Sequence, residues 1–160
     1  MASELEKIPD RAMFQILKQV ARNCESEGIS FGSINSEVSE VINDTLKIFG
    51  VVDKIRYIDD DYIWTLVNLN KDKLSDDKLT GSLIRPQLKE YEYDVQVSET
   101  VYQTQSWENT IESYGDPYYL ARLMEYQGDF EYYEGKQGYS DVHDSEINEI
   151  TIVRKSFTEI

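Results

Sequence analysis

The fold of the second half of this 160-residue chain is decided by a six-residue stretch, Tyr114-Gly115-Asp116-Pro117-Tyr118-Tyr119. Glycine ends a helix readily because it tolerates positive φ, aspartate caps the next helix, and proline fits into a first helical turn. The stretch therefore predicts a tight connection between two helices, the first over residues 106–114 with Ser106 as its N-cap, the second from Pro117 to about Gly128. Any two consecutive helices could be joined in this way, so the stretch indicates local geometry more strongly than function.

Strands are predicted on both sides of these two helices. Apolar and polar residues alternate roughly over residues 93–102, which is typical of a half-buried strand, and an apolar run over 147–157 predicts a closing strand. Ten of the 12 tyrosines follow residue 90, so the chain changes character there. We therefore expect a βααβ domain over residues 91–160.

The sequence of the first half of the chain predicts two helices followed by a β-hairpin. Apolar residues recur at three- and four-residue steps over 9–27 and 34–49, the helical period, and glycines follow both runs. Two runs of β-branched and aromatic residues, 51–58 and 62–69, are separated by Asp59-Asp60-Asp61, which predicts a β-hairpin with a solvated acidic turn. The predicted class is α+β: a helix-helix-hairpin unit in residues 1–70, a linker of low apolar content in 71–90, and the domain in 91–160.

The composition argues against enzyme catalysis and against nucleic-acid binding. The 31 acidic and 16 basic side chains give a net charge of −15, which repels DNA or RNA. The single cysteine, Cys24, lies in phase with the apolar face of the first helix and is expected to be a buried thiol, and the single histidine, His143, lies in a polar stretch. Glu108 and Glu112, four residues apart on the predicted helix, are read as solvated. We expect no enzyme activity, no cofactor and no metal site.

The second half resembles a known family. The residues that carry the resemblance are Ser106-Trp107, the stretch 114–119, and Leu123-Met124-Glu125-Tyr126-Gln127-Gly128. Together they resemble the lysin motif (LysM), in the degenerate form found in small baseplate and tail proteins of contractile-tailed phages. The resemblance implies a virion structural protein, a baseplate (wedge) component of a phage tail, whose partners are other protein subunits of that assembly.

The resemblance also leaves an alternative, a peptidoglycan- or N-acetylglucosamine-binding LysM protein. The groove for docking or for a glycan would then be formed by the residues around the helices: Gln103, Thr104, Gln105, Trp107, Tyr114, Gly115, Tyr118, Tyr119, Gln127, Gly128 and Asp129. Aromatic residues in the acidic segment that follows suggest a partner-contact loop, because tyrosine is enriched at interfaces: Phe130, Tyr132, Tyr133 and Tyr139.

Two further expectations follow from charge and from the start of the sequence. The strongly acidic composition permits a third function, mimicry of DNA to inhibit a DNA-binding protein. The first residues have no basic segment followed by an apolar run, and no stretch reaches the roughly 20 apolar residues of a membrane span. We therefore expect no secretion signal and no membrane partner, and a virion protein assembled in the host cytoplasm.

Overall fold

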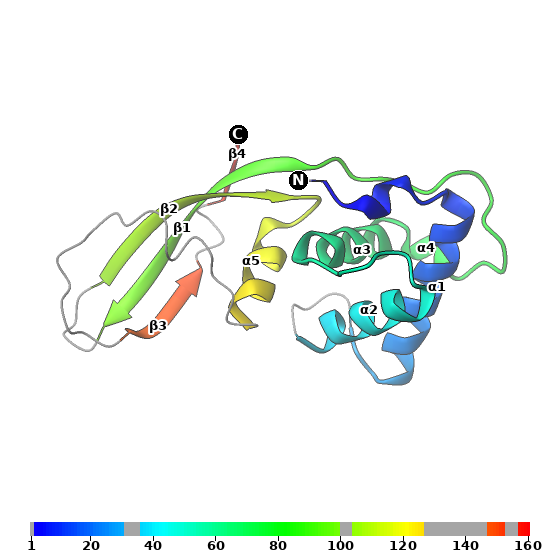
Figure 1. Cartoon of the computed structure of the whole chain (residues 1–160), viewed down its shortest axis with the longest axis horizontal. Coiled ribbons are helices and arrows are strands. Elements are labelled where there is room, and N and C mark those ends of the chain that lie inside the picture. The colour runs from blue at the N-terminus through cyan, green and yellow to red at the C-terminus, as the bar shows by residue number, and fades with distance from the viewer. Residues whose placement is uncertain (1, 31–35, 100–103, 127–146, 153–156) are drawn as a thin grey trace.

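The structure, a computed structural model, describes residues 2–30, 36–99, 104–126, 147–152 and 157–160 (Figure 1). It confirms a mixed α+β fold with the helices first and a small antiparallel sheet after them. The elements in chain order are the 3₁₀ helix η1 (Glu4–Lys7), α1 (Asp10–Ser26), α2 (Ser36–Phe49), α3 (Tyr57–Leu69), α4 (Lys71–Leu74), β1 (Lys89–Glu99), β2 (Thr104–Ser113), α5 (Pro117–Tyr126), β3 (Ile147–Ile152) and β4 (Thr158–Glu159).

The elements η1 and α1 to α4 form a helical body with one apolar core. The helices predicted at 9–27 and 34–49 are confirmed as α1 and α2, and Gly28 and Gly50 follow them with φ of 70° and 61°. Cys24 is buried in the core, as predicted, and burial raises the pKa of its thiol to about 11. The largest fully buried side chains of the body come from η1 and the three long helices: Leu5, Met13, Phe14, Ile16, Leu17, Ile42, Leu46, Tyr62, Ile63 and Leu66.

The hairpin predicted over residues 51–69 is wrong, because residues 57–69 form the single helix α3. The β-branched and aromatic composition of this segment resembled strands because α3 is buried on most of its surface and shows no amphipathic period. Asp59, Asp60 and Asp61 are correspondingly in the first turns of a helix, where the helix dipole favours negative charge, and not in a solvated turn.

The elements β1, β2, α5, β3 and β4 form what we call the sheet arm. Strand β1 is central: it pairs antiparallel with β2 on one side and with β3 and β4 on the other. The helix predicted over 106–114 is wrong, since these residues belong mainly to β2. A four-residue spacing such as Trp107 to Ile111 keeps two side chains on one face of a strand as well as of a helix, so it did not distinguish the two. The order of the described elements is therefore ββαββ, with one helix where βααβ predicts two. The strand predicted from residue 93, the helix from Pro117 and the closing strand from 147 are confirmed as β1, α5 and β3.

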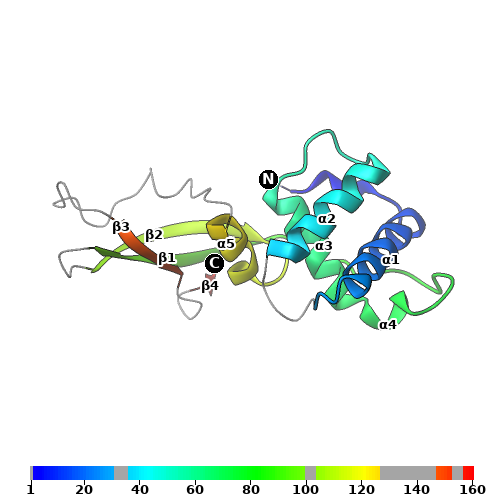
Figure 2. The ribbon, with the colours of Figure 1, turned by 90° about the horizontal axis from the view of Figure 1, so that it is seen from below.

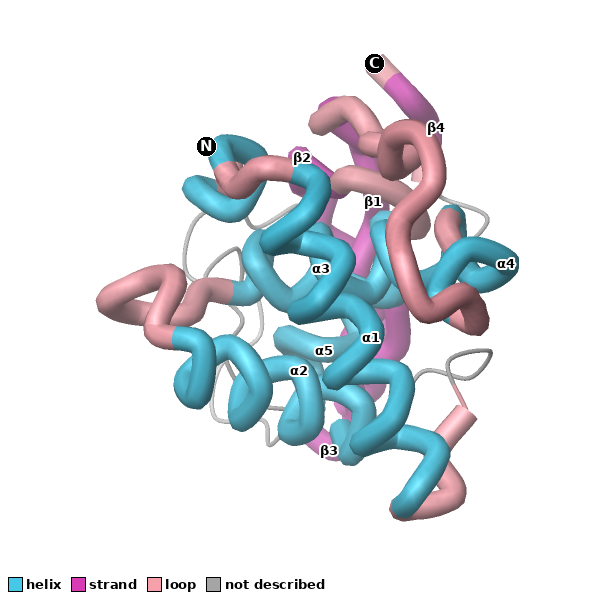
Figure 3. Tube along the Cα trace, turned by 90° about the vertical axis from the view of Figure 1, so that its right-hand side faces the viewer, coloured by secondary structure: helices cyan, strands magenta, loops and turns pink. Residues whose placement is uncertain are grey.

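Helix α5 lies between the sheet and the helical body. Figures 1 and 2 show the β1–β2 ribbon projecting from the body, with α5 against the sheet on one side and next to α2 and α3 on the other. Figure 3, a view from the helical side, shows α1 to α3 in front of the strands. The two halves of the chain therefore meet at α3 and α5.

The predicted linker, residues 71–90, contains α4 and the start of β1 and packs against the body. Leu83 is buried, and its N–H donates a hydrogen bond to Asp10. Arg85 donates to the Asp10 carboxylate at 2.7 Å and to the Tyr62 hydroxyl at 2.8 Å. None of the described helices is both long and apolar enough to cross a bilayer.

Candidate functional site

Three consecutive aspartates near the start of α3 are the most unusual feature of the structure. The residues Asp59, Asp60 and Asp61 are 1%, 2% and 0% exposed, although aspartate is almost never fully buried without a partner. Successive residues of a helix point about 100° apart, so the three carboxylates reach three different parts of the fold. They form what we call the aspartate junction.

Asp59 faces the N-terminal segment. Its carboxylate accepts hydrogen bonds from the Ser3 hydroxyl and from the Arg56 N–H, the latter at 2.8 Å. The second contact is a local cap that stabilises the start of α3.

Asp60 joins the helical body to the sheet arm. One carboxylate oxygen accepts from the Ser39 hydroxyl at 2.7 Å and from the Asn43 amide at 2.9 Å, both on α2. The other accepts from the Tyr119 hydroxyl of α5 at 2.8 Å. Trp64 of α3 stacks on the Tyr119 ring, with centroids 4.2 Å apart and planes at 11°. Tyr119 is thus held by both its hydroxyl and its ring.

Asp61 holds the turn between β2 and α5. Its Oδ2 atom accepts from the Tyr114 N–H at 2.8 Å and from the Ser113 hydroxyl at 3.1 Å. Its Oδ1 atom and the hydroxyl of Thr65, one helical turn later, are buried and have no hydrogen-bond partner among the described residues. A buried oxygen without a partner makes the charged form of a carboxyl costly.

Gly115 is needed in this turn for a different reason from the one predicted. The glycines with positive φ are Gly28, Gly50 and Gly81 among the described residues, and Gly115 is not one of them. A Cβ atom at Gly115 would instead lie 2.6 Å from the Thr65 hydroxyl oxygen. Glycine therefore allows the turn to approach α3 closely. Asp116 and Pro117 behave as predicted: Asp116 accepts from the Tyr118 N–H at 3.0 Å, and α5 begins at Pro117.

Burial changes the acidity of the junction. Burial raises the pKa of Asp60 to about 6 and that of Asp61 to about 7, against the lowering effect of their hydrogen-bond donors. The negative charge of Asp60 adds to the rise at Asp61. Burial, and next the charge of Asp60, raises the pKa of the Tyr119 hydroxyl, which stays protonated as the donor. The contact between body and arm therefore titrates near neutral pH.

Tyr114 makes a second contact between the two halves. Its hydroxyl accepts from the Ser3 N–H at 2.8 Å and donates to the Glu6 carboxylate. Its ring lies 4.5 Å from that of Tyr62 in the core, centroid to centroid. The β2–α5 turn is therefore fixed to α3 and to the N-terminal segment.

The structure describes only part of the predicted groove. Tyr114 and Tyr119 are buried contacts of the body, and Tyr118 is half-buried with its hydroxyl accepting from Arg122. Gly115 lines the pocket described in the next paragraph. Thr104, Gln105 and Trp107 lie on β2, where the structure describes the backbone alone. The other predicted positions lie outside the described residues: Gln103, Gln127, Gly128, Asp129, Phe130, Tyr132, Tyr133, Tyr139 and also His143.

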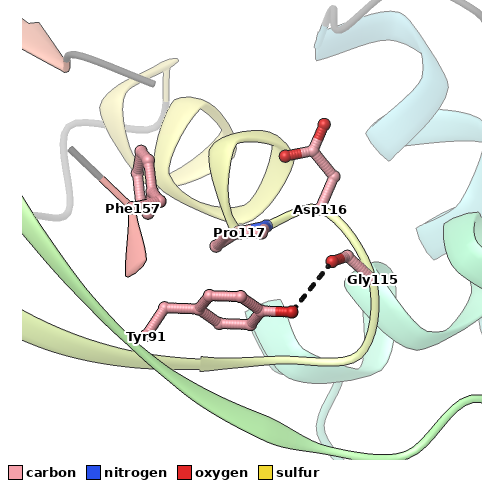
Figure 4. Close-up of a pocket in the computed structure, with 5 residues that line it drawn as sticks. All are labelled: Tyr91, Gly115, Asp116, Pro117 and Phe157. Carbon is pink, nitrogen blue, oxygen red and sulfur yellow. Dashed lines mark hydrogen bonds between the residues drawn. The ribbon is translucent and has the colours of Figure 1, made fainter. Parts of the chain in front are cut away.

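A pocket of about 270 Å³ opens beside the β2–α5 turn. Its lining residues come from β1, from the turn and the start of α5, and from the approach to β4: Tyr91, Gly115, Asp116, Pro117 and Phe157 (Figure 4). The Tyr91 hydroxyl donates to the Gly115 carbonyl at 3.4 Å, a weak bond across the base of the turn. Small-molecule and cofactor sites usually measure about 300–1,000 Å³, so this pocket is better matched to one side chain.

Sequence reasoning missed the aspartate junction, although one signal was present. Acidic residues directly before a long apolar run are typical of a helix N-terminus, and Asp59 to Asp61 precede such a run. That signal predicts the helix but not the burial, because the partners Ser39, Tyr114 and Tyr119 are distant in sequence.

The described residues contain no cluster of three or more His, Cys, Asp or Glu side chains arranged to hold a metal ion. The aspartates of the junction diverge and bind donors of the protein itself. Comparison of the chain with protein-family models, with curated proteins and with solved structures finds no match.

Proposed function

We propose that this protein is a structural protein that docks neighbouring subunits of a larger assembly and does not catalyse a reaction. The observation that carries the proposal is the sheet arm, a β-ribbon that projects from a helical body and is fastened to it by buried polar contacts (Figure 1).

The outer strand of the arm supports docking. Strand β2 pairs with β1 along residues 104–113 and, within the described residues, with no other strand. Alternate N–H and C=O groups of such a strand point away from its neighbour, and they can pair with a strand of another chain. The arm could therefore receive a strand of a neighbouring subunit.

The hydrogen bonds of the aspartate junction support the same function. All three accept hydrogen bonds from the fold itself, and Asp60 and Asp61 connect the arm to the body. A fixed arm presents its edge to a partner with less loss of conformational freedom than a mobile one. These carboxylates therefore serve rigidity in this proposal and not acid–base chemistry.

The kind of assembly rests on the LysM resemblance alone. With residues 104–113 in a strand, the resemblance depends on the turn 114–119 and on α5. It favours a baseplate (wedge) position in the tail of a contractile phage.

The test is co-expression with the structural proteins encoded beside its gene. We expect a complex of defined stoichiometry with a sheath, tube or baseplate subunit. In that complex the outward-facing amides of β2 should exchange hydrogen more slowly than in the free protein, whereas the core amides of α1, an internal control, should not change.

Two other results would contradict the proposal. One is tight binding to chitin oligomers or peptidoglycan without any complex with those subunits, as expected of a glycan-binding LysM protein. The other is a complex only with a DNA-binding enzyme that DNA displaces, as expected of an acidic mimic.

A further inference from the structure

We propose that the pocket formed by Tyr91, Gly115, Asp116, Pro117 and Phe157 receives an arginine side chain of the docking partner. This inference rests on the proposed function, because it names the chemistry of a contact that the docked subunit would make. Its basis is the combination of aromatic walls, surrounding negative charge and small volume.

Aromatic rings provide the walls. Figure 4 shows the rings of Tyr91 and Phe157 on two sides of Pro117, with the Asp116 carboxylate extending away from the Tyr91 ring. The Phe157 ring is held by two other rings: it stacks on Tyr93, with centroids 5.1 Å apart and planes at 9°, and it lies nearly perpendicular to Tyr118, with centroids 6.4 Å apart. Rings held in this way offer their π faces to a cation without a large loss of side-chain entropy.

Among the residues that the structure describes, most of the charges around the pocket are negative. Burial, followed by the carboxylate of Glu159, raises the pKa of Tyr91, and Asp116 acts in the same direction. Within the described part of the chain, the cation that acts against them is Lys89, whose ammonium lies 3.4 Å from the Glu159 carboxylate and pairs with it. With a net charge of −15 over the whole chain, the surroundings favour a cationic group over an anionic or neutral one.

The same aromatic cluster already binds a guanidinium. Arg122, one turn along α5, lies over the ring of Tyr118 at 5.1 Å and donates to its hydroxyl at 2.8 Å. Tyr118 in turn contacts Phe157, which lines the pocket. Because guanidinium stacks on aromatic faces and is more weakly hydrated than ammonium, arginine suits this pocket better than lysine.

The experiment uses N-acetyl-L-arginine amide as the probe and its neutral isostere, N-acetyl-L-citrulline amide, as the matched control. Binding to the full chain is followed by NMR through the ring signals of Tyr91 and Phe157. We expect saturable shifts with the arginine probe at millimolar concentration and none with citrulline.

Three variants locate the binding. Asp116→Asn keeps the helix cap, because asparagine caps as well as aspartate, and removes the negative charge. It should weaken binding about two- to fivefold, the range of a partly exposed ion pair. Phe157→Leu keeps an apolar side chain but removes the ring, and it should weaken binding by a similar factor. Asp77→Asn removes the same charge from an exposed position in the segment after α4 and should leave binding unchanged.

Equal binding of arginine and citrulline would overturn the proposal, as would unchanged arginine binding in both pocket variants. The proposed function is judged separately by the complex with neighbouring structural subunits. A complex whose stability is unaffected by Asp116→Asn and Phe157→Leu would refute the arginine contact and leave the docking function standing.

Discussion

The helical body and the sheet arm are stabilised by different means. The body has a continuous apolar core from η1, α1, α2 and α3, and its largest buried side chains are mostly aliphatic. The arm has a smaller described core, in which Tyr93, Tyr119, Leu120, Ala121 and Leu123 are buried. Tyr119 reaches the body through its hydroxyl, and the turn before α5 does so through Tyr114.

This difference teaches where the fold is vulnerable. Apolar packing tolerates small changes of volume, but a buried polar contact fails when one partner is removed, because the other partner stays buried without a hydrogen bond. Although the aspartate junction has few residues, a substitution there should therefore weaken the attachment of the arm to the body strongly. The predictions below test that difference, in order of decreasing effect.

The largest effect is expected from Asp60→Ala. It removes the acceptor for Ser39, Asn43 and Tyr119 at once. The Tyr119 hydroxyl would stay buried without its acceptor, at a cost of about 1–3 kcal/mol, and the bonds from Ser39 and Asn43 contribute about 0.5–1.5 kcal/mol each, so the free energy of unfolding at pH 6 should fall by about 3 kcal/mol. Urea denaturation measures this, with Asp44→Ala, an exposed position on α2, as the control within about 0.5 kcal/mol. Equal losses in the two variants would show that Asp60 is not a structural anchor.

A pH dependence should follow from Asp61. Its pKa is raised to about 7 in the folded state, so the folded state holds the proton more tightly than the unfolded state does. The stability is then greatest below the unfolded pKa and is lost as pH rises through about 7. Two other carboxyl groups face Asp61 and disfavour its negative charge: Asp60 on the same helix and Asp116 on the turn.

The variant Asp61→Asn cannot ionise. Relative to the wild type, it should gain stability on the order of 2 kcal/mol between pH 5 and pH 8, because the folded wild type holds the Asp61 proton that the unfolded chain has lost. Denaturant unfolding of both proteins at both pH values checks this. A difference that does not depend on pH would show that Asp61 ionises as freely in the folded protein as in the unfolded chain.

Gly115→Ala should reduce stability by about 2 kcal/mol through overpacking against Thr65. The backbone at this position requires no positive φ, so the close contact alone is responsible. Combining it with Thr65→Ala, which removes the two nearest atoms, should restore part of the loss. Thermal or denaturant unfolding of the four proteins of this cycle gives the coupling energy. Strictly additive losses would place the cost elsewhere in the turn.

The smallest effect is expected from Tyr91→Phe, which removes only the weak bond to the Gly115 carbonyl. The ring that lines the pocket remains, so the stability should change by less than about 0.5 kcal/mol. A loss comparable to that of Asp60→Ala would mean that the arm depends on its own turn more than on the junction.

The sequence-based predictions were right for some elements and wrong for others in both the helical body and the sheet arm. Helices α1 and α2 were predictable because each has one apolar face, and α5 because Asp116-Pro117 marks its start. Helix α3 was not, since a helix buried on most sides has no polar face to give it a period. Strand β2 was not predictable, because the four-residue spacing of its apolar residues fits a strand as well as a helix. The aspartate junction depends on partners distant in sequence, and charged residues are ordinarily predicted to be exposed.

The most direct test of the junction is a carboxyl ¹³C NMR titration of the wild-type protein. Asp60 and Asp61 should titrate with apparent pKa values of about 6 and 7. The amide signals of Ser39 in the body and of Tyr114 and Tyr119 in the arm should shift with the same midpoints. Titration of both carboxyls near the ordinary aspartate value of about 3.9, with no matching shifts in the arm, would contradict a buried connection between body and arm.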